Sequence, residues 1–228
     1  MIVIRSAKVR AILRWALPLA AIPTLVALGA LAFPHRLHLL ISLGVAVLAL
    51  LTFAAGFEKR KTGSRRMVLT AVMIALCVAG RFIPFFKPVT ALTVLTAIYL
   101  GPEAGFLTGA LAAALSNFYF GQGPWTAFQM LAWGLTGFIA GCLAEPLKRH
   151  RALLLLYGTI SGVAYTLVMD VWTVLWYAEG FDWGLYAAAF TTALPHTALY
   201  AVSNFAFLLL LAGPIGVKLE RVRVKYDI

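Results

Sequence analysis

The sequence predicts an all-α integral membrane protein, and three observations lead to this fold class. Of the 228 residues, 62% are hydrophobic and only 12% are charged, and the mean hydropathy is +0.92. A soluble domain has about 45–50% apolar residues. Uncharged runs of spanning length also recur from one end of the chain to the other. Because lipid offers the backbone no hydrogen-bond partners, these runs are expected to be helices.

Eight apolar runs are long enough to be candidate transmembrane helices. The runs cover residues 12–33, 37–56, 67–83, 86–100, 102–118, 125–145, 152–178 and 186–213. A polar segment, Phe57–Arg66, divides the first two runs from the other six. We therefore expect residues 1–66 to form an N-terminal transmembrane helix pair with a basic loop. Residues 67–228 are expected to form a six-helix membrane core with a basic C-terminal tail.

The basic residues indicate the orientation of these helices, because cytoplasmic loops carry the excess of Lys and Arg. With eight spans and an inner N-terminus, all but three of the 19 Lys and Arg residues fall on inner segments, and the exceptions are Arg36, Arg81 and Lys87. Both termini are therefore expected in the cytoplasm of a prokaryotic cell, with the chain in its inner or plasma membrane. The basic residues lie between apolar runs and not on one face, so nucleic acid does not explain the net charge of +11.

Several reaction classes are excluded because their motifs are missing from the sequence. There is no GxxxxGK[ST] loop for nucleotide phosphates, no HExxH zinc helix and no GxSxG nucleophile motif. The apolar runs also lack the clustered carboxylates of a proton relay. We predict no enzyme activity, no cofactor and no metal site. A membrane-embedded enzyme and a non-transporting structural protein of the envelope are the alternatives to a binding protein.

Small residues recur at four-residue spacing on three of the predicted helices, which places them on one face of each helix. On the first core helix they are Ala71, Ala75 and Ala79. This stripe is open to two interpretations, docking of a partner helix or packing inside the bundle. On the third and fourth core helices we interpret the pattern as internal packing, and the residues are Gly105, Gly109, Ala113, Gly137 and Gly141.

An outer loop from Ser116 to Trp125 mixes aromatic and amide side chains, among them Asn117 and Gln122. In the helix that follows, Trp125, Gln129 and Trp133 repeat at four-residue spacing. Aromatic rings at a membrane interface often only anchor the protein. An amide between two indoles suits an amphipathic organic ligand better than it suits lipid tails. We therefore expect these residues to bind substrate.

The last two predicted helices carry further candidates for ligand binding. Asp170 lies near the outer end of its helix, where it either contacts ligand or is interfacial, and Trp176 belongs to an aromatic row beside it. His196 follows Pro195 near the middle of the last run, and Tyr200 continues its face. A lone histidine is more often a core residue than a metal ligand.

These residues together resemble a known family. The alanine stripe, the six-helix core with both ends inside, the GPEAGF segment at 101–106 and the FGQGPW segment at 120–125 are similar to the S component of energy-coupling-factor (ECF) vitamin transporters. The resemblance covers roughly residues 67–215. It implies a substrate-binding core that captures a vitamin or vitamin precursor from outside. It also implies docking through Ala71, Ala75 and Ala79 on a separate transmembrane coupling protein that carries two ATP-binding-cassette ATPases.

The resemblance extends to a substrate class. The tryptophan-rich sequence is most similar to S components linked to cobalamin-type corrinoid uptake, and riboflavin, queuosine-type bases, tryptophan and biotin remain open as alternatives. The side chains available to a ligand are Asn117, Gln122, Trp125, Gln129, Trp133, Asp170, Trp176, His196 and Tyr200. The N-terminal helix pair has no counterpart in the family's six-helix pattern, and its role is not implied by the resemblance.

Overall fold

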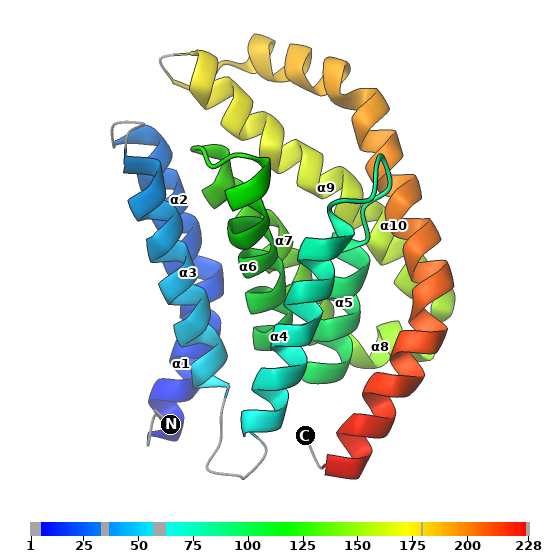
Figure 1. Ribbon diagram of the computed structural model, residues 1–228. Helices are drawn as coiled ribbons and strands as arrows, with labels where there is room; N and C mark the ends of the chain where they lie inside the picture. The colour runs from blue at the N-terminus through cyan, green and yellow to red at the C-terminus, as the bar shows by residue number, and fades with distance from the viewer. Residues whose placement is uncertain (1–5, 33–36, 57–62, 179, 227–228) are drawn as a thin grey trace.

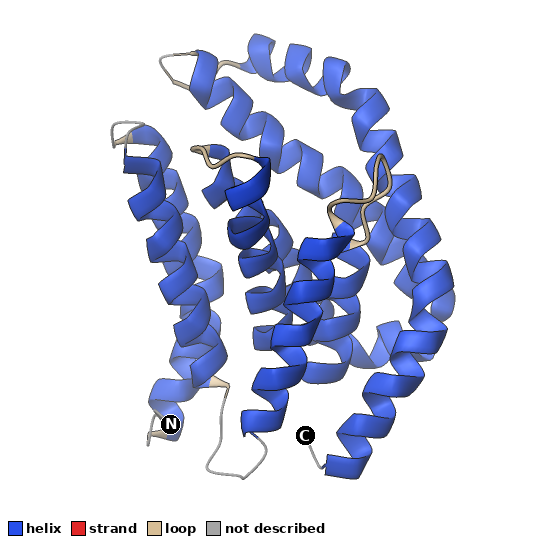
Figure 2. Cartoon of the chain, in the orientation of Figure 1, coloured by secondary structure: helices blue, strands red, loops and turns tan. Residues whose placement is uncertain are grey.

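The computed structural model describes residues 6–32, 37–56, 63–178 and 180–226, and every regular element in these ranges is a helix (Figure 2). The bundle in Figure 1 consists of α1 (Ala7–Ala16), the π-helical turn η1 (Leu17–Ala21), α2 (Ile22–Leu31), α3 (His38–Ala55), α4 (Gly63–Gly80), α5 (Val89–Leu100), α6 (Pro102–Phe120), α7 (Trp125–Cys142), α8 (Ala144–Arg149), α9 (Arg151–Tyr177) and α10 (Trp183–Tyr226).

Each of the eight predicted runs coincides with a helical segment, and the differences lie at the ends. The short helix α8 follows α7 within the predicted inner loop. The largest difference is α10, which continues to Tyr226 where the sequence predicted a tail after residue 213. At 1.5 Å per residue α10 is about 66 Å long, roughly twice the apolar thickness of a bilayer. Figure 1 shows it curving, and Pro195 and Pro214 lie inside it.

The N-terminal pair consists of the continuous segment α1–η1–α2 and the antiparallel helix α3 (Figure 1). The two helices pack on each other and then on α6 and α7. Ile22, Val26, Val45 and Ala49 are buried between these elements. The N-terminal pair therefore packs along one side of the core, and its buried residues are part of the same hydrophobic cluster.

Helix α5 lies at the centre of the core and packs on α4, α6, α7, α9 and α10. All but one of its residues are buried. Helices α6 and α7 approach most closely, because Gly105 lies on the backbone of Gly137 and Gly109 lies on the backbone of Trp133. A methyl group at either glycine would collide with backbone atoms. The prediction that these glycines serve packing inside the bundle is confirmed.

Five segments are long and apolar enough to cross a membrane: Ala7–Leu31, His38–Ala55, Gly63–Gly80, Arg151–Tyr177 and Trp183–Tyr226. The chain is thus a multi-pass membrane protein, while the count of eight spans stays a prediction.

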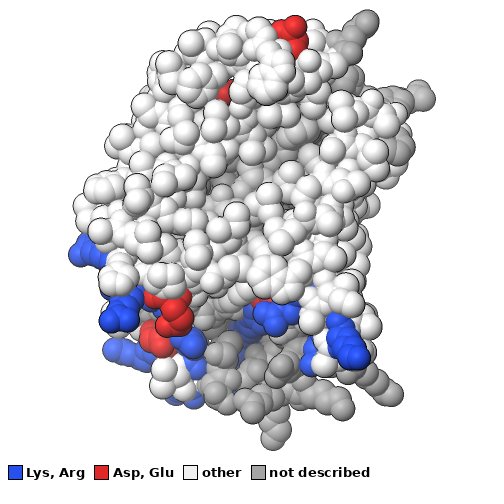
Figure 3. All heavy atoms as spheres, turned by 180° about the vertical axis from the view of Figure 1, so that it is seen from behind, with Lys and Arg blue, Asp and Glu red and all other residues white. Residues whose placement is uncertain are grey.

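Figure 1 shows both ends of the chain at the same end of the bundle. On the face seen in Figure 3 the Lys and Arg side chains gather at that end too, whereas Arg81 and Lys87 lie in the loop between α4 and α5 at the other end. The predicted basic residues 59–61 lie outside the described residues.

We expect the basic end to face the cytoplasm, because it carries the excess of Lys and Arg. In a background without native cysteines, Ser64→Cys should react with a membrane-impermeant maleimide only after the cells are broken open. Tyr119→Cys, at an exposed position near the opposite end, should react in intact cells. Labelling of Ser64→Cys from outside would contradict the predicted orientation.

Candidate functional site

A chain of polar side chains crosses the core at the end opposite the termini, and it begins at Arg81, directly after α4. One guanidinium nitrogen of Arg81 donates to Asn117 Oδ1 at 2.7 Å and to Ser116 Oγ at 2.5 Å. The Asn117 amide then donates to Gln129 Oε1 at 2.8 Å, and Gln129 donates to the Tyr165 hydroxyl at 3.0 Å. The chain links α4, α6, α7 and α9. Polar groups inside a bundle need such partners because lipid supplies none.

Aromatic rings stack beside this polar chain. Trp133 stacks on Tyr165 with ring centroids 4.9 Å apart, and Tyr165 stacks on Tyr200 at 5.0 Å with an interplanar angle of 3°. His196 continues the row, 4.6 Å from Tyr200. The guanidinium of Arg81 lies 5.3 Å from the centroid of the Trp133 ring. This aromatic ladder, Trp133–Tyr165–Tyr200–His196, therefore runs from a buried cation to an exposed histidine.

Two buried donors of this cluster have no hydrogen-bond partner within the described part of the chain, Arg81 Nε and Trp133 Nε1. Arg81 is 8% exposed and Trp133 is fully buried. Among the described residues no carboxylate pairs with Arg81. An unpaired buried donor costs about 1–3 kcal/mol, so it is unusual without a reason. Arg81 Nε and Trp133 Nε1 are therefore the two open hydrogen-bonding positions of the cluster.

The structure separates the residues that the sequence grouped together. Asn117, Gln129, Trp133, His196 and Tyr200 belong to one cluster. Trp125 and Trp176 instead lie on either side of Trp172, at 5.6 and 5.9 Å. The cavity beside Trp172 and Trp176, between the N-terminal pair and the core, has a volume of only about 20 Å³, room for a water molecule and not for a vitamin.

Two other predicted residues remain. Gln122 is joined to the cluster through the Thr126 hydroxyl, which accepts from the Asn117 amide at 2.8 Å and donates to the Gln122 oxygen at 3.0 Å. The Gln122 amide donates to the carbonyl of Ala114, and its oxygen accepts from Thr126, so this side chain shapes the loop after α6. Asp170 is 7% exposed, and its Oδ2 has no partner in the described residues.

Sequence reasoning missed Arg81 and Tyr165, which connect the cluster. Arg81 was counted only as one of three basic residues on outer segments. An arginine on the outer side is contrary to the positive-inside rule. Its position could therefore have indicated a role in the site. The sequence around Tyr165 gave no comparable indication, because the pattern of one helix does not show which side chains of other helices it contacts.

The proposed docking residues Ala71, Ala75 and Ala79 all lie on the exposed face of α4. Val68 and Val72 on the same side are 63% and 49% exposed. The described structure therefore does not use this stripe for packing inside the bundle.

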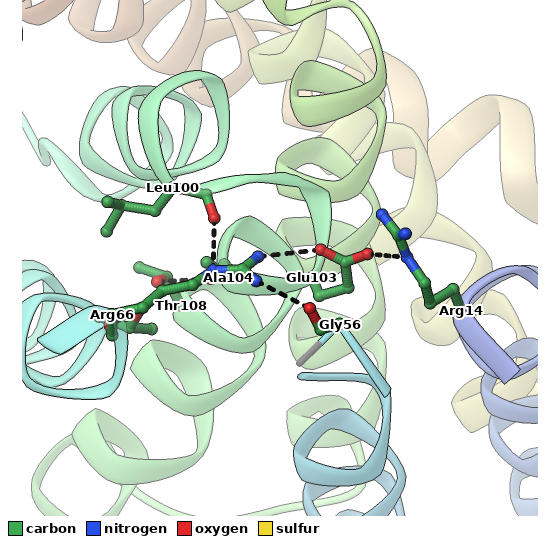
Figure 4. Close-up of polar contacts among 8 residues, drawn as sticks. Arg14, Gly56, Arg66, Leu100, Glu103, Ala104 and Thr108 are labelled. Carbon is green, nitrogen blue, oxygen red and sulfur yellow. Dashed lines mark hydrogen bonds and ion pairs between the residues drawn. The ribbon is translucent and has the colours of Figure 1, made fainter. Parts of the chain in front are cut away.

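A buried carboxylate at the opposite end of α6 joins the N-terminal pair to the core (Figure 4). Glu103 is 1% exposed and is paired with Arg14 of α1 and, at 3.0 Å, with Arg66 of α4. Arg66 also donates to the carbonyls of Leu100 and Gly56. This double-arginine clamp thus gathers the ends of α3, α4, α5 and α6 at one point.

The turn that presents Glu103 requires glycine at position 101. Gly101 has φ of +97°, which favours glycine, and an added Cβ would lie 2.7 Å from the Arg66 guanidinium. Pro102 then begins α6 at the position where helices tolerate proline. The first part of the GPEAGF segment therefore has a structural explanation in the clamp.

The fold is thus a helical membrane bundle with a buried polar-aromatic cluster at one end. Residues 61–221 match the family described as ECF-type riboflavin transporter, S component, and this chain belongs to that family of S components. The family is one of transporter subunits, not of enzymes. The match does not extend to the corrinoid type that the sequence suggested. Comparisons with curated proteins and with solved structures give no significant match.

Replacing Glu103 by alanine should strongly destabilise the fold, because it leaves Arg66, whose side chain is 14% exposed, without its carboxylate. Removing one partner of a buried ion pair costs about 3–5 kcal/mol. We expect a clearly lower thermal unfolding temperature in detergent for Glu103→Ala, and a smaller decrease for Arg14→Gln, because the Arg14 side chain is 45% exposed.

Glu145→Gln is the matched control for the clamp, because the Glu145 side chain is 86% exposed and its ion pair with Lys148 lies within one helical turn at the surface. This variant should unfold at the temperature of the wild type. Equal unfolding temperatures for Glu103→Ala and the wild type would show that the clamp does not hold the bundle.

Proposed function

We propose that this chain is the substrate-binding subunit of an ECF-type importer and that it captures riboflavin or a closely related flavin from outside the cell. The observation that carries the ligand class is the buried cluster of Arg81, Asn117, Gln129, Trp133 and Tyr165. It lies within the residues that match the riboflavin-type family. The proposal thus rests on family membership for the activity and on the chemistry of the cluster for the ligand.

The chemistry of a flavin is complementary to that of the cluster. An isoalloxazine ring is flat and aromatic, so it suits an aromatic cluster, where it would take the place of one stacking partner because Tyr165 already lies between Trp133 and Tyr200. Its carbonyl oxygens and ring nitrogens are acceptors for the unpaired donors of Arg81 and Trp133. The hydroxyl groups of its ribityl chain can exchange hydrogen bonds with side-chain amides. A corrinoid, the ligand first expected from the sequence, is much larger and has no such single flat aromatic face.

Transport itself requires partners, because the sequence has no nucleotide-binding motif. We propose that a transmembrane coupling protein with two ATP-binding-cassette ATPases binds the exposed alanine stripe of α4. Small side chains permit a close approach of helix backbones, which in lipid is a main source of helix association. The exposure of Ala71, Ala75 and Ala79 supports this assignment over internal packing.

Disrupting the cluster should weaken flavin binding. Gln129→Ala removes one hydrogen-bond partner from Asn117 and one from Tyr165, at a cost of about 1–3 kcal/mol, so the Kd should rise roughly 5- to 150-fold. Trp133→Phe keeps a ring but removes the unpaired indole N–H, and it should also raise the Kd. Quenching of riboflavin fluorescence by the purified protein measures both variants.

Trp15→Phe is the control for this titration, because Trp15 packs on Phe138 at the edge of the bundle, outside the cluster. It should bind like the wild type. If Gln129→Ala and Trp133→Phe, both folded, also kept the wild-type Kd, the binding site would lie elsewhere.

A bulky side chain on the alanine stripe should abolish transport and leave ligand binding intact. Ala75→Trp places a large side chain on the exposed face of α4, so the protein should fold and bind ligand while transport and co-purification with the coupling module fail. Leu210→Trp, at a 66% exposed position on α10, serves as the control and should transport normally. Normal transport by Ala75→Trp would refute docking through this face.

A further inference from the structure

A groove of about 380 Å³ opens at the basic end of the bundle, between the beginning of α4 and the end of α10. Its lining consists of Ser64, Arg65, Val68, Leu69, Val222 and Tyr226. The volume lies within the range of small-molecule sites, about 300–1,000 Å³. The groove is far from the polar-aromatic cluster, which lies beyond the opposite end of α4, so it is a separate feature.

The rim of the groove is positively charged. The Arg65 guanidinium lies 4.3 Å from the centroid of the Tyr226 ring, and the Lys225 ammonium lies 5.3 Å from the same ring. Among the described residues that line the groove, none is acidic. Glu220, on the same helix as Tyr226, is already paired with Arg223 at 3.3 Å. Both cations thus lie close to Tyr226, and an anion held near that ring would be attracted by both.

The floor of the groove is aliphatic. Val68, Leu69 and Val222 form the floor. Val72, one helical turn after Val68 on the same side of α4, is 49% exposed. A soluble anion would make no use of this apolar continuation, and an apolar helix would make no use of the cations. A molecule that combines a negative headgroup with hydrocarbon chains uses both.

We propose that this groove binds an anionic phospholipid of the inner leaflet. The phosphodiester lies between Arg65 and Lys225, and an acyl chain follows the aliphatic floor along α4 and α10. Basic pockets between transmembrane helices on the cytoplasmic side are typical sites for such headgroups, and each Lys or Arg near the surface contributes about 1 kcal/mol. The site does not depend on which vitamin the chain captures.

Native mass spectrometry of the purified full chain tests the site. The protein is equilibrated with equal amounts of palmitoyl-oleoyl phosphatidylglycerol and phosphatidylcholine, and the lipids that remain bound are counted. The wild type should retain phosphatidylglycerol preferentially. The double variant Arg65→Gln/Lys225→Gln should retain it roughly 5- to 30-fold less. Inorganic phosphate should not displace it, because phosphate lacks the chains.

Lys8→Gln/Arg149→Gln is the matched control, because it removes the same charge from exposed positions at the same end, away from the groove. It should retain phosphatidylglycerol like the wild type. Three results would overturn the proposal: no preference in the wild type, equal retention in the Arg65→Gln/Lys225→Gln variant, or displacement by phosphate alone. Loss of coupling-module binding in that variant with unchanged lipid retention would also overturn it, because the groove would then be a protein contact.

Discussion

The arrangement of the bundle depends on charged hydrogen bonds that tie α4 to α6 at both ends. At the basic end Arg66 binds Glu103, and at the opposite end Arg81 binds Ser116 and Asn117. Glu103 and Asn117 are separated by about 21 Å along α6, and the two arginines by about 22 Å along α4. Because a charge inside a membrane bundle is costly without a partner, each tie fixes the register of the two helices.

These ties relate the proposed docking surface to the proposed ligand site. Helix α4 presents Ala71, Ala75 and Ala79 outward, and the residue that follows its last turn is Arg81, which begins the polar chain to Gln129 and Tyr165. If docking displaced α4, the hydrogen bond from Arg81 to Asn117 would therefore transmit the displacement to Asn117. The N-terminal pair joins the same frame through Arg14 on Glu103, which gives it a structural role as a wall of the core.

The sequence predicted the helices well and the site only in part. Long uncharged runs locate helices because lipid permits little else, so the errors fall at ends such as that of α10, where a basic segment was taken for a tail although Glu220 and Arg223 pair along a helical turn. A period of four places Trp125, Gln129 and Trp133 on one face, but it does not reveal that Trp125 meets Trp172 while Trp133 meets Tyr165. Partners on other helices, such as Arg14 for Glu103, leave no periodic signal.

The cluster around Arg81 and Trp133 is the proposed site for a flat flavin ring. The most direct measurement offers the purified chain an equimolar mixture of riboflavin, cobalamin, biotin, queuine and tryptophan, removes free ligand, and identifies what remains bound by native mass spectrometry. We expect one riboflavin per chain and its loss in Trp133→Phe. Retention of cobalamin or another of these compounds in place of riboflavin, or of none of them by the folded chain, would contradict it.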